Sequence, residues 1–304
     1  MQHQTIEDIV LAHETRNMTA LRPFLPHDFV SDAARLVLAN RGRALIVTGF
    51  YIQRAGAPET DGPPGAAALG GALRALGYDV CYVTDRFSAG AVQAVAGDEP
   101  IIEFPVLGHE ESRLAAADLL ARHRPAVLVS IERPGLLSDG TYRNCAGIDF
   151  SDYNARTDYL FTQHPASVGI GDGGNEIGMG LLRDTIARTA GLPDDPSVTR
   201  TTRLIIASCS NWGAYGLVAA LSLMTNRALL PSVERAHGWV RRIVEAGGVD
   251  GLTGERKDWV DGRSPEEDAL CLRALHSLLK RSGVAGTPEE RAASRPEGPR
   301  SGGP

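Results

Sequence analysis

The segment from residue 169 to 180 contains residue types that a ligand site needs. It reads GIGDGGNEIGMG, and its glycines allow positive φ and a close approach of the backbone to a ligand. Its acidic and amide side chains bring oxygen atoms to a predicted strand-to-helix junction. Oxygen ligands of this kind suit Mg²⁺ or Mn²⁺, or an ammonium group, better than a bare phosphate. We predict catalytic roles for Asp172, Asn175 and Glu176, metal ligation by Asp172 and Glu176, and substrate contacts from Gly173 and Gly174.

The same segment matches the dinucleotide-binding pattern GxGxxG at Gly169, Gly171 and Gly174. A nicotinamide-dependent oxidoreductase is therefore one alternative. In such a protein an acidic residue that binds ribose would end the next strand, whereas here that strand ends at Ala207-Ser208-Cys209. We expect no organic cofactor, and the sequence has no Walker A motif.

A second loop, residues 58–65, reads PETDGPPG and follows a predicted strand. It places two carboxylates and a hydroxyl on a turn that prolines stiffen. A structural interpretation is that Asp61 caps the helix that begins near Pro64, and this is compatible with a catalytic role. Glu59 and Asp61 are candidate catalytic groups, and Thr60 is a candidate substrate contact.

A third loop begins at Glu132 and Arg133, at the end of a buried strand. These two side chains could simply pair with each other. A guanidinium group also donates two parallel hydrogen bonds, which suits a substrate carboxylate, and we predict this role for Arg133. Asp139 and Tyr142, close behind, are candidate substrate contacts.

A fourth loop, residues 208–216, reads SCSNWGAYG and enters a helix. Ser210 could be only the N-cap of that helix and Trp212 only a packing residue. The alternative is that Asn211 and adjacent backbone N–H groups hold an oxyanion, with Ser210 and Trp212 contacting the substrate. Cys209 is a further candidate, as a nucleophile.

Alternating strands and helices must position these loops. Apolar runs and turn residues predict strands at 43–50, 79–84, 101–104, 126–131, 167–170 and 204–208, and helices at 64–76, 110–123, 152–163, after Gly174, at 214–224, after Pro231 and from Pro265 to about Lys280. This pattern predicts an α/β fold with a mostly parallel sheet and helices on both faces, a Rossmann-like three-layer arrangement. Ligands in such folds bind at the carboxyl ends of the strands, where all four loops fall.

The predicted organisation is one α/β domain over residues 1–282. Residues 1–42 form a helical lead-in, with helices predicted at Thr5–Arg16 and Phe29–Asn40. Residues 283–304 consist almost entirely of Gly, Pro, Ser, Arg and Glu, and we expect this tail to be disordered.

Composition favours small-molecule chemistry. The 304 residues include 31 basic and 37 acidic ones, interspersed, for a net charge of -6, so we expect neither nucleic acid nor membrane as a partner. Four scattered cysteines indicate neither a disulfide framework nor a zinc site. Residues 1–18 lack the pattern of a secretory signal, and we expect a cytoplasmic protein. The oligomeric state is left open, with a homo-oligomer among the forms allowed.

These loops together resemble the D-glutamate cyclase family. The resemblance runs roughly from Arg43 to Gly262 and rests on motifs in the expected order. They are TGF (48–50), PETDGPPGA (58–66), IERPG (131–135), GDGGNEIGMG (171–180), SNWGAYGL (210–217), GGVDG (247–251) and VDG (260–262).

The resemblance implies conversion of D-glutamate into 5-oxo-D-proline and water, with an amino acid as the substrate. In that reaction Glu59 or Asp61 would take a proton from the amine, and Asp172 and Glu176 would activate the γ-carboxyl group, directly or through Mn²⁺ or Mg²⁺. Asn211 would hold the oxyanion and Arg133 the α-carboxylate. Two alternatives stay open: a related lactam-forming enzyme acting on another amino acid, and a non-catalytic module that binds an amino acid.

Overall fold

The computed structural model describes residues 4–144 and 146–284. Its centre is a six-stranded sheet in the order β5-β4-β1-β6-β7-β8, and every neighbouring pair is parallel. The strands are β1 (Arg43–Thr48), β4 (Asp79–Thr84), β5 (Ile101–Glu103), β6 (Val127–Ile131), β7 (Ser167–Gly171) and β8 (Arg203–Ile206). A separate antiparallel hairpin, not predicted from the sequence, pairs β2 (Tyr51–Ile52) with β3 (Ala57–Pro58).

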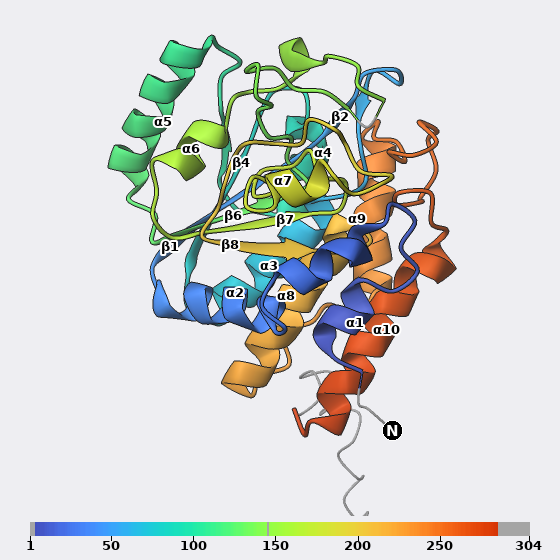
Figure 1. The fold of residues 1–304 in the computed structure, drawn as a ribbon. Helices are drawn as coiled ribbons and strands as arrows, with labels where there is room; N and C mark the ends of the chain where they lie inside the picture. Colours follow the sequence, from blue (N-terminus) through green and yellow to red (C-terminus); the bar gives the residue numbers. More distant parts are fainter. Residues whose placement is uncertain (1–3, 145, 285–304) are drawn as a thin grey trace, which may run out of the picture.

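Helices cover both faces of the sheet, which confirms the predicted α/β three-layer fold (Figure 1). One face packs against α5 (His109–His123) and α6 (Asp158–Thr162). The other packs against α2 (Phe29–Ala39), α3 (Pro63–Ala75), α4 (Ala89–Ala96) and α8 (Ser210–Thr225). Outside this second layer lie α1 (Ile6–Val10), α9 (Val233–Glu245) and α10 (Pro265–Arg281). The remaining short elements are η1 (Met18–Phe24), η2 (Ser151–Tyr153) and α7 (Arg183–Ile186).

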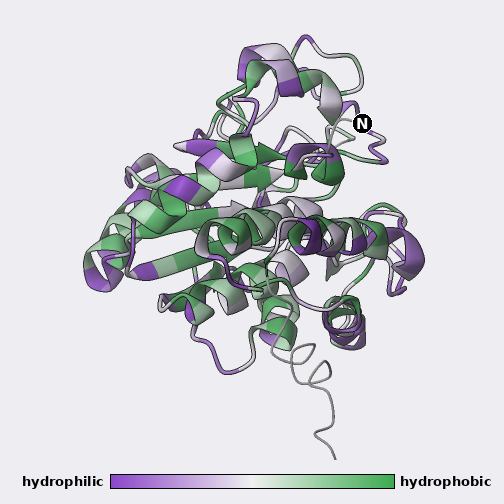
Figure 2. Ribbon diagram, turned by 90° about the horizontal axis from the view of Figure 1, so that it is seen from below, coloured by the Kyte–Doolittle hydropathy of each residue, from purple (hydrophilic) through white to green (hydrophobic). Residues whose placement is uncertain are grey.

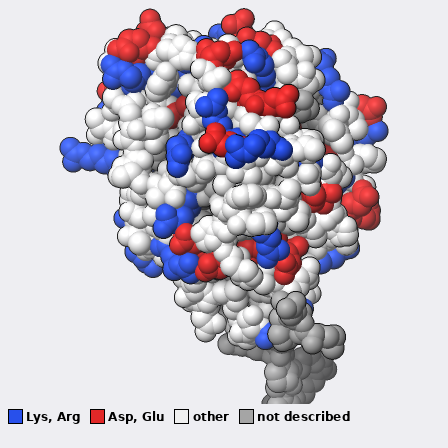
Figure 3. Space-filling model, in the orientation of Figure 1, with Lys and Arg blue, Asp and Glu red and all other residues white. Residues whose placement is uncertain are grey.

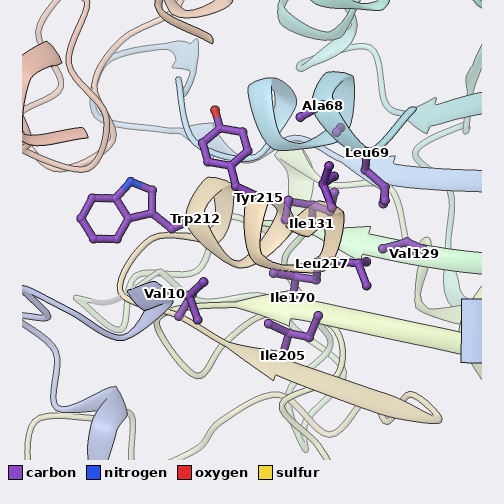
Figure 4. Packing of buried hydrophobic residues seen from close by; sticks show 14 of the residues in the cluster. Val10, Ala68, Leu69, Val129, Ile131, Ile170, Ile205, Trp212, Tyr215 and Leu217 are labelled. Atoms are coloured by element: carbon purple, nitrogen blue, oxygen red, sulfur yellow. The ribbon is translucent and has the colours of Figure 1, made fainter. Parts of the chain in front are cut away.

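The strands are apolar on both faces because helices cover both. All five residues of β6 are buried, as expected for a parallel sheet with two covered faces. Figure 4 shows Ile131, Ile170 and Ile205 on neighbouring strands facing α8, with Leu217 of that helix lying toward them. Each such side chain contributes roughly 1.5–3 kcal/mol by leaving water. Figure 2 shows the same distribution, with green strands inside and purple concentrated on the outer helices and loops.

The surface carries charges of both signs. On the face shown in Figure 3, basic and acidic side chains are interspersed rather than gathered into one field. Within the described residues no helix is long and apolar enough to cross a membrane.

The strand order places a topological switch between β1 and β6, the two central strands of the sheet. From β1 the chain proceeds to β4 and β5 on one side, and later to β6, β7 and β8 on the other. Connections therefore leave β1 and β6 in opposite directions, and the loops after these strands diverge. Doubly wound sheets bind ligands in the crevice that this divergence opens.

Four helix predictions were wrong in extent or place. The helix predicted after Gly174 begins only at Arg183, as the four-residue α7, because Gly174 and Gly178 have φ of +94° and +108° and residues 172–182 form a compact loop. The N-terminal helix ends at Val10, and His13 at φ +54° prevents its continuation to Arg16. The helix predicted at 152–163 is divided into η2 and α6.

The fourth of these differences lies at the start of α8. Helix α8 begins at Ser210 rather than at Ala214. In the predicted disordered tail, residues 285–304 lie outside the described residues.

Candidate active site

Four loops come together at the carboxyl edge of the sheet. They follow β1, β6, β7 and β8, which lie side by side. Ser210, at the start of α8, links the other three loops. Its backbone N–H donates to Asp61 Oδ2 at 2.9 Å and to Asp172 Oδ2 at 3.1 Å, and its hydroxyl donates to Glu132 Oε2 at 2.5 Å. The acidic side chains that the sequence distributed over separate loops therefore form one assembly.

A cavity of about 460 Å³ opens over this assembly, a volume that accommodates a small molecule. Its floor is acidic and its mouth is largely apolar, with Ile148 and Leu252 more than half exposed there. The lining acids are Glu59, Glu132, Asp172, Glu176 and Asp261, the lining cations are Arg16 and Arg54, and the apolar lining includes Phe50, Tyr51, Ile52, Ile148 and Leu252.

Three of the acids form a tight group. Single carboxylate oxygens of Glu132, Asp172 and Glu176 lie within 4.8 Å of one another, close enough to hold one metal ion. Burial first, and then neighbouring negative charges, raise the pKa of Glu132 well above its usual value. Burial also raises the pKa of Asp172, although Arg16 opposes the rise. For Glu176, burial and then the charge of Asp172 raise the pKa to about 7.

Backbone amides hold Glu176 in this group. Its Oε1 accepts from Asp172 N at 3.1 Å and Gly173 N at 2.6 Å, and its Oε2 accepts from Gly174 N at 2.8 Å. Gly171 must be glycine because a Cβ there would lie 2.9 Å from Glu176 Cδ. The backbone of residues 172–174 is therefore turned toward the Glu176 carboxylate, and the residues directly after Gly174 are not helical, although the sequence predicts a helix there.

Asp61 accepts hydrogen bonds from the first turn of α8. It does not cap α3, the helix that follows it in sequence and that it was predicted to cap. Its Oδ1 accepts from Asn211 N at 2.8 Å, and its Oδ2 accepts from Ser210 N. Asp61, Asp172 and Cys209 form a second set of possible metal ligands. Burial raises the pKa of the Cys209 thiol well above its usual value, which disfavours the thiolate needed for ligation or nucleophilic attack.

Glu59 has an unusual environment for a carboxyl group. It lines the cavity, is only 6% exposed, and its Oε1 has no hydrogen-bond partner among the described residues. Burial first, and then the charge of Asp61, raise its pKa well above the usual value. Glu59 thus combines a raised pKa with an oxygen that is free to accept a proton.

Our site prediction missed four charged residues that line the cavity: Arg16, Arg54, Glu132 and Asp261. Arg16 Nη1 donates to Asp172 Oδ1 at 2.8 Å and to Asp261 Oδ2 at 2.7 Å, and its Nη2 also pairs with Asp261. Asp261 belongs to the VDG motif, and this is the one sequence signal that could have drawn attention to it. Both Glu132 (φ +45°) and Asp261 (φ +52°) have left-handed backbones, a strain that tends to be kept where function requires it.

Arg133 does not line the cavity, and its placement does not support the predicted clamping of a substrate carboxylate. The side chain is fully buried and forms an ion pair with Asp85. It also donates to Gly49 O at 2.8 Å and to Ala155 O at 3.0 Å. The pairing of Arg133 with Glu132 that we considered is likewise absent, because Glu132 accepts from Ser210.

Several other predicted site residues already form hydrogen bonds with other groups of the protein, most of them in the interior and Asp139 at the surface. Asn211 Nδ2, the group that would donate to an oxyanion, already donates to Thr60 O at 3.3 Å, and the side-chain oxygen accepts from Gly62 N and Gly65 N, at 3.0 and 2.7 Å. Trp212 Nε1 donates to Asp268 Oδ1 at 2.8 Å, which agrees with its packing interpretation. The further engaged groups are Thr60, whose hydroxyl donates to Trp259 O, Tyr142, whose hydroxyl donates to Asp158, and Asp139, which accepts from Thr141.

Of the remaining predicted site residues, some line the cavity and one does not. Asn175 and Gly173 line the cavity, and Asn175 Nδ2 donates to Arg143 O at 3.0 Å. Gly174 is not among the lining residues, and a Cβ there would meet Pro193 and Ile186 at 3.0 Å. The structure therefore brings Glu59, Asp172, Asn175 and Glu176 to one cavity, with Asp61 directly behind it.

The fold and the cavity define a class of protein: a doubly wound α/β protein with a cluster of buried carboxyl groups at its switch point. The family described as D-glutamate cyclase-like, C-terminal, matches residues 6–276, and the chain belongs to this family. Among curated proteins, human mitochondrial D-glutamate cyclase is 32% identical over 216 residues, which is 64% of this chain and 35% of the relative. The chain thus spans about a third of the length of this relative.

Proposed function

We propose that this protein is an enzyme, a lyase that closes D-glutamate into 5-oxo-D-proline with release of water. The observation that carries the proposal is the convergence of Glu59 with the group of Glu132, Asp172 and Glu176 on one amino-acid-sized cavity. Membership of the D-glutamate cyclase-like family supports the choice of substrate.

Glu59 is the proposed base. The α-ammonium group must lose a proton before its nitrogen can attack the γ-carboxyl carbon, and a buried carboxylate with a raised pKa has an increased affinity for that proton. Asp61 is less suited, because its oxygens already accept hydrogen bonds from the start of α8. In the overall reaction the nitrogen gives up two protons, the carbon–nitrogen bond forms, and one carboxyl oxygen leaves with both protons as water.

Positioning accounts for much of the expected rate. The amine and the γ-carboxyl group belong to the same molecule, so holding the folded conformer supplies a high effective concentration without ATP. The apolar side chains at the cavity mouth exclude water, and this strengthens the interactions of the reacting groups with the charged floor.

A divalent cation fits the cluster of three carboxylates, from Glu132, Asp172 and Glu176, on the cavity floor. Five acids line the cavity against two arginines, so negative charge is in excess before a substrate with two carboxylates enters. An all-oxygen donor set from Glu132, Asp172 and Glu176 suits Mg²⁺ or Mn²⁺. Such an ion, when bound, would polarise the γ-carboxyl group and offset its charge.

The test is product formation by chelator-treated protein. We would incubate it with D- or L-glutamate, with and without Mn²⁺ or Mg²⁺, and follow 5-oxoproline by chiral chromatography. Product from D-glutamate alone, dependent on added metal, is the expected result. Turnover of a different amino acid, or saturable binding of D-glutamate without product, would replace this proposal with one of the two alternatives.

The cytoplasmic location also stays a prediction. Fractionation of the source cells, followed by immunodetection of the chain, would test it.

A further inference from the structure

The two arginines that line the cavity differ in how many of their N–H groups remain available to a ligand. Among the described residues they are Arg16 and Arg54. Both terminal nitrogens of Arg16 are bound to Asp172 and Asp261, so this side chain offsets charge on the acidic floor. Arg16 is therefore poorly placed to receive a further anion.

Arg54 has no carboxylate partner within residues 4–144 and 146–284. It lies in the turn of the hairpin between β2 and β3, at the cavity mouth. Its Nη2 donates to two backbone carbonyls, Leu252 O and, at 3.3 Å, Gly251 O. No carboxylate lies within ion-pair distance of Arg54 in the described part of the chain, and its Nη1 and Nε make no hydrogen bond there. The guanidinium is thus tethered by one nitrogen and can still donate from the other two.

The hydrogen bond from Arg54 Nη2 to Gly251 O brings Arg54 to the residue against which Glu59 packs. A Cβ on Gly251 would lie 1.9 Å from Glu59 Oε2, so this carboxyl group packs directly against the residue whose carbonyl Arg54 holds. Backbone bonds fix the arrangement: Glu59 N donates to Phe50 O, and Thr60 N donates to Val249 O. One hairpin and one loop therefore present a carboxyl group and a guanidinium group to the same side of the cavity.

We propose that Arg54 binds the α-carboxylate of the substrate and thereby selects α-amino acids over amines that lack this group. The proposal rests on the proposed function, in which Glu59 faces the α-amine. Amine and α-carboxylate are attached to one carbon, and Glu59 and Arg54 both contact one residue, Gly251. The γ-carboxyl group is then directed to the acidic floor, where a cation would receive it.

This role has a distinct kinetic consequence. The α-carboxylate survives in the lactam, so Arg54 holds substrate and product alike and contributes uniform binding. Loss of this contact should raise KM and leave kcat largely unchanged. A residue with a purely structural role would instead lower the amount of folded protein or change both parameters.

The experiment compares Arg54→Gln, Arg54→Lys and the control Arg256→Gln. Arg256 is exposed in the same loop as Gly251 and does not line the cavity. The substrates are D-glutamate and 4-aminobutanoate, which lacks the α-carboxylate and would close to 2-pyrrolidinone. We expect Arg54→Gln to lower kcat/KM for D-glutamate about 10- to 100-fold through KM, from the loss of charge-assisted hydrogen bonds. The lysine variant should recover part of this loss, and Arg256→Gln should behave as wild type.

Binding measurements keep this test separate from that of the proposed function. Ligand-induced thermal shifts are recorded for both substrates with every variant. If the wild type turns over neither substrate, the proposed function fails, while Arg54→Gln must still abolish the preference for D-glutamate over 4-aminobutanoate. An unchanged preference in that variant, an equal loss for both ligands, or no wild-type preference at all would overturn the assignment of Arg54.

Discussion

Replacing Glu132 with glutamine should stabilise the metal-free protein at high pH while impairing its chemistry. The substitution preserves shape, and the new side-chain oxygen can still accept from the Ser210 hydroxyl. It removes one charge from the group formed with Asp172 and Glu176, whose oxygens lie within 4.8 Å. At this separation one pair of like charges costs roughly 3.5 kcal/mol with an effective dielectric constant of 20.

The stability gain should depend on pH. The pKa of Glu132 in the folded protein lies well above the value of 4.5 that applies when the side chain is in water. Below the unfolded value the group is protonated in both states, and wild type and variant should be about equally stable. As the pH rises toward the folded pKa, unfolding of the wild type releases a proton and its stability falls by about 1.4 kcal/mol per pH unit. The glutamine variant lacks this loss.

Urea denaturation in the presence of a chelator, from pH 5 to pH 9, measures this difference. We expect the variant to exceed the wild type by roughly 1–3 kcal/mol at the highest pH, after discounting the Coulomb limit for the protonation of neighbouring acids. The exposed Glu255→Gln variant, in which Lys257 loses its partner, serves as the control and should show no such trend. A difference that is constant with pH, or a variant less stable at every pH, would refute this account of the carboxyl group.

Three further substitutions test the site and its support. Glu59→Gln should reduce kcat for D-glutamate about 10²- to 10⁴-fold because it removes the proposed base, and turnover that stays within a few-fold of wild type would exclude that role. Gly251→Ala should also impair turnover, since its Cβ would meet Glu59 Oε2 at 1.9 Å; normal kinetics would show that the loop can move aside. Asp85→Asn should lower the free energy of unfolding by about 3–5 kcal/mol, because Arg133 then lacks its buried counter-charge, and a urea midpoint equal to that of wild type would contradict this.

Much of the fold follows from local sequence because each strand is a short apolar run between turn residues. The order of alternating elements is sufficient to predict a parallel sheet, and parallel strands carry their following loops to one edge. For this reason the convergence of Glu59, Asp172 and Glu176 could be anticipated. That the helix expected after Gly174 begins only at Arg183 could not be inferred from periodicity alone, because the loop exists through Glu176 accepting from three backbone N–H groups.

Pairing between distant side chains lies outside the reach of sequence patterns. Arg133 has the residue type and position expected of a carboxylate clamp, yet Asp85, 48 residues earlier, neutralises it in the interior. Arg16 was assigned to an N-terminal helix, yet it contacts Asp172 and, 245 residues away, Asp261. None of these three aspartates is close in sequence to the arginine that it contacts, so no spacing rule indicates the contacts.

The sequence by itself therefore determined the α/β architecture, the edge of the sheet that carries the site and most of the acids on its floor. These features depend on strand periodicity and on the residues that immediately follow each strand. The tertiary structure decided which charges are neutralised and that Arg54 rather than Arg133 faces the cavity. It also decided that Glu59 Oε1 has no hydrogen-bond partner in the described part of the chain. Charge balance and desolvation depend on every segment that packs around a group, and these segments become neighbours only when the whole chain has folded.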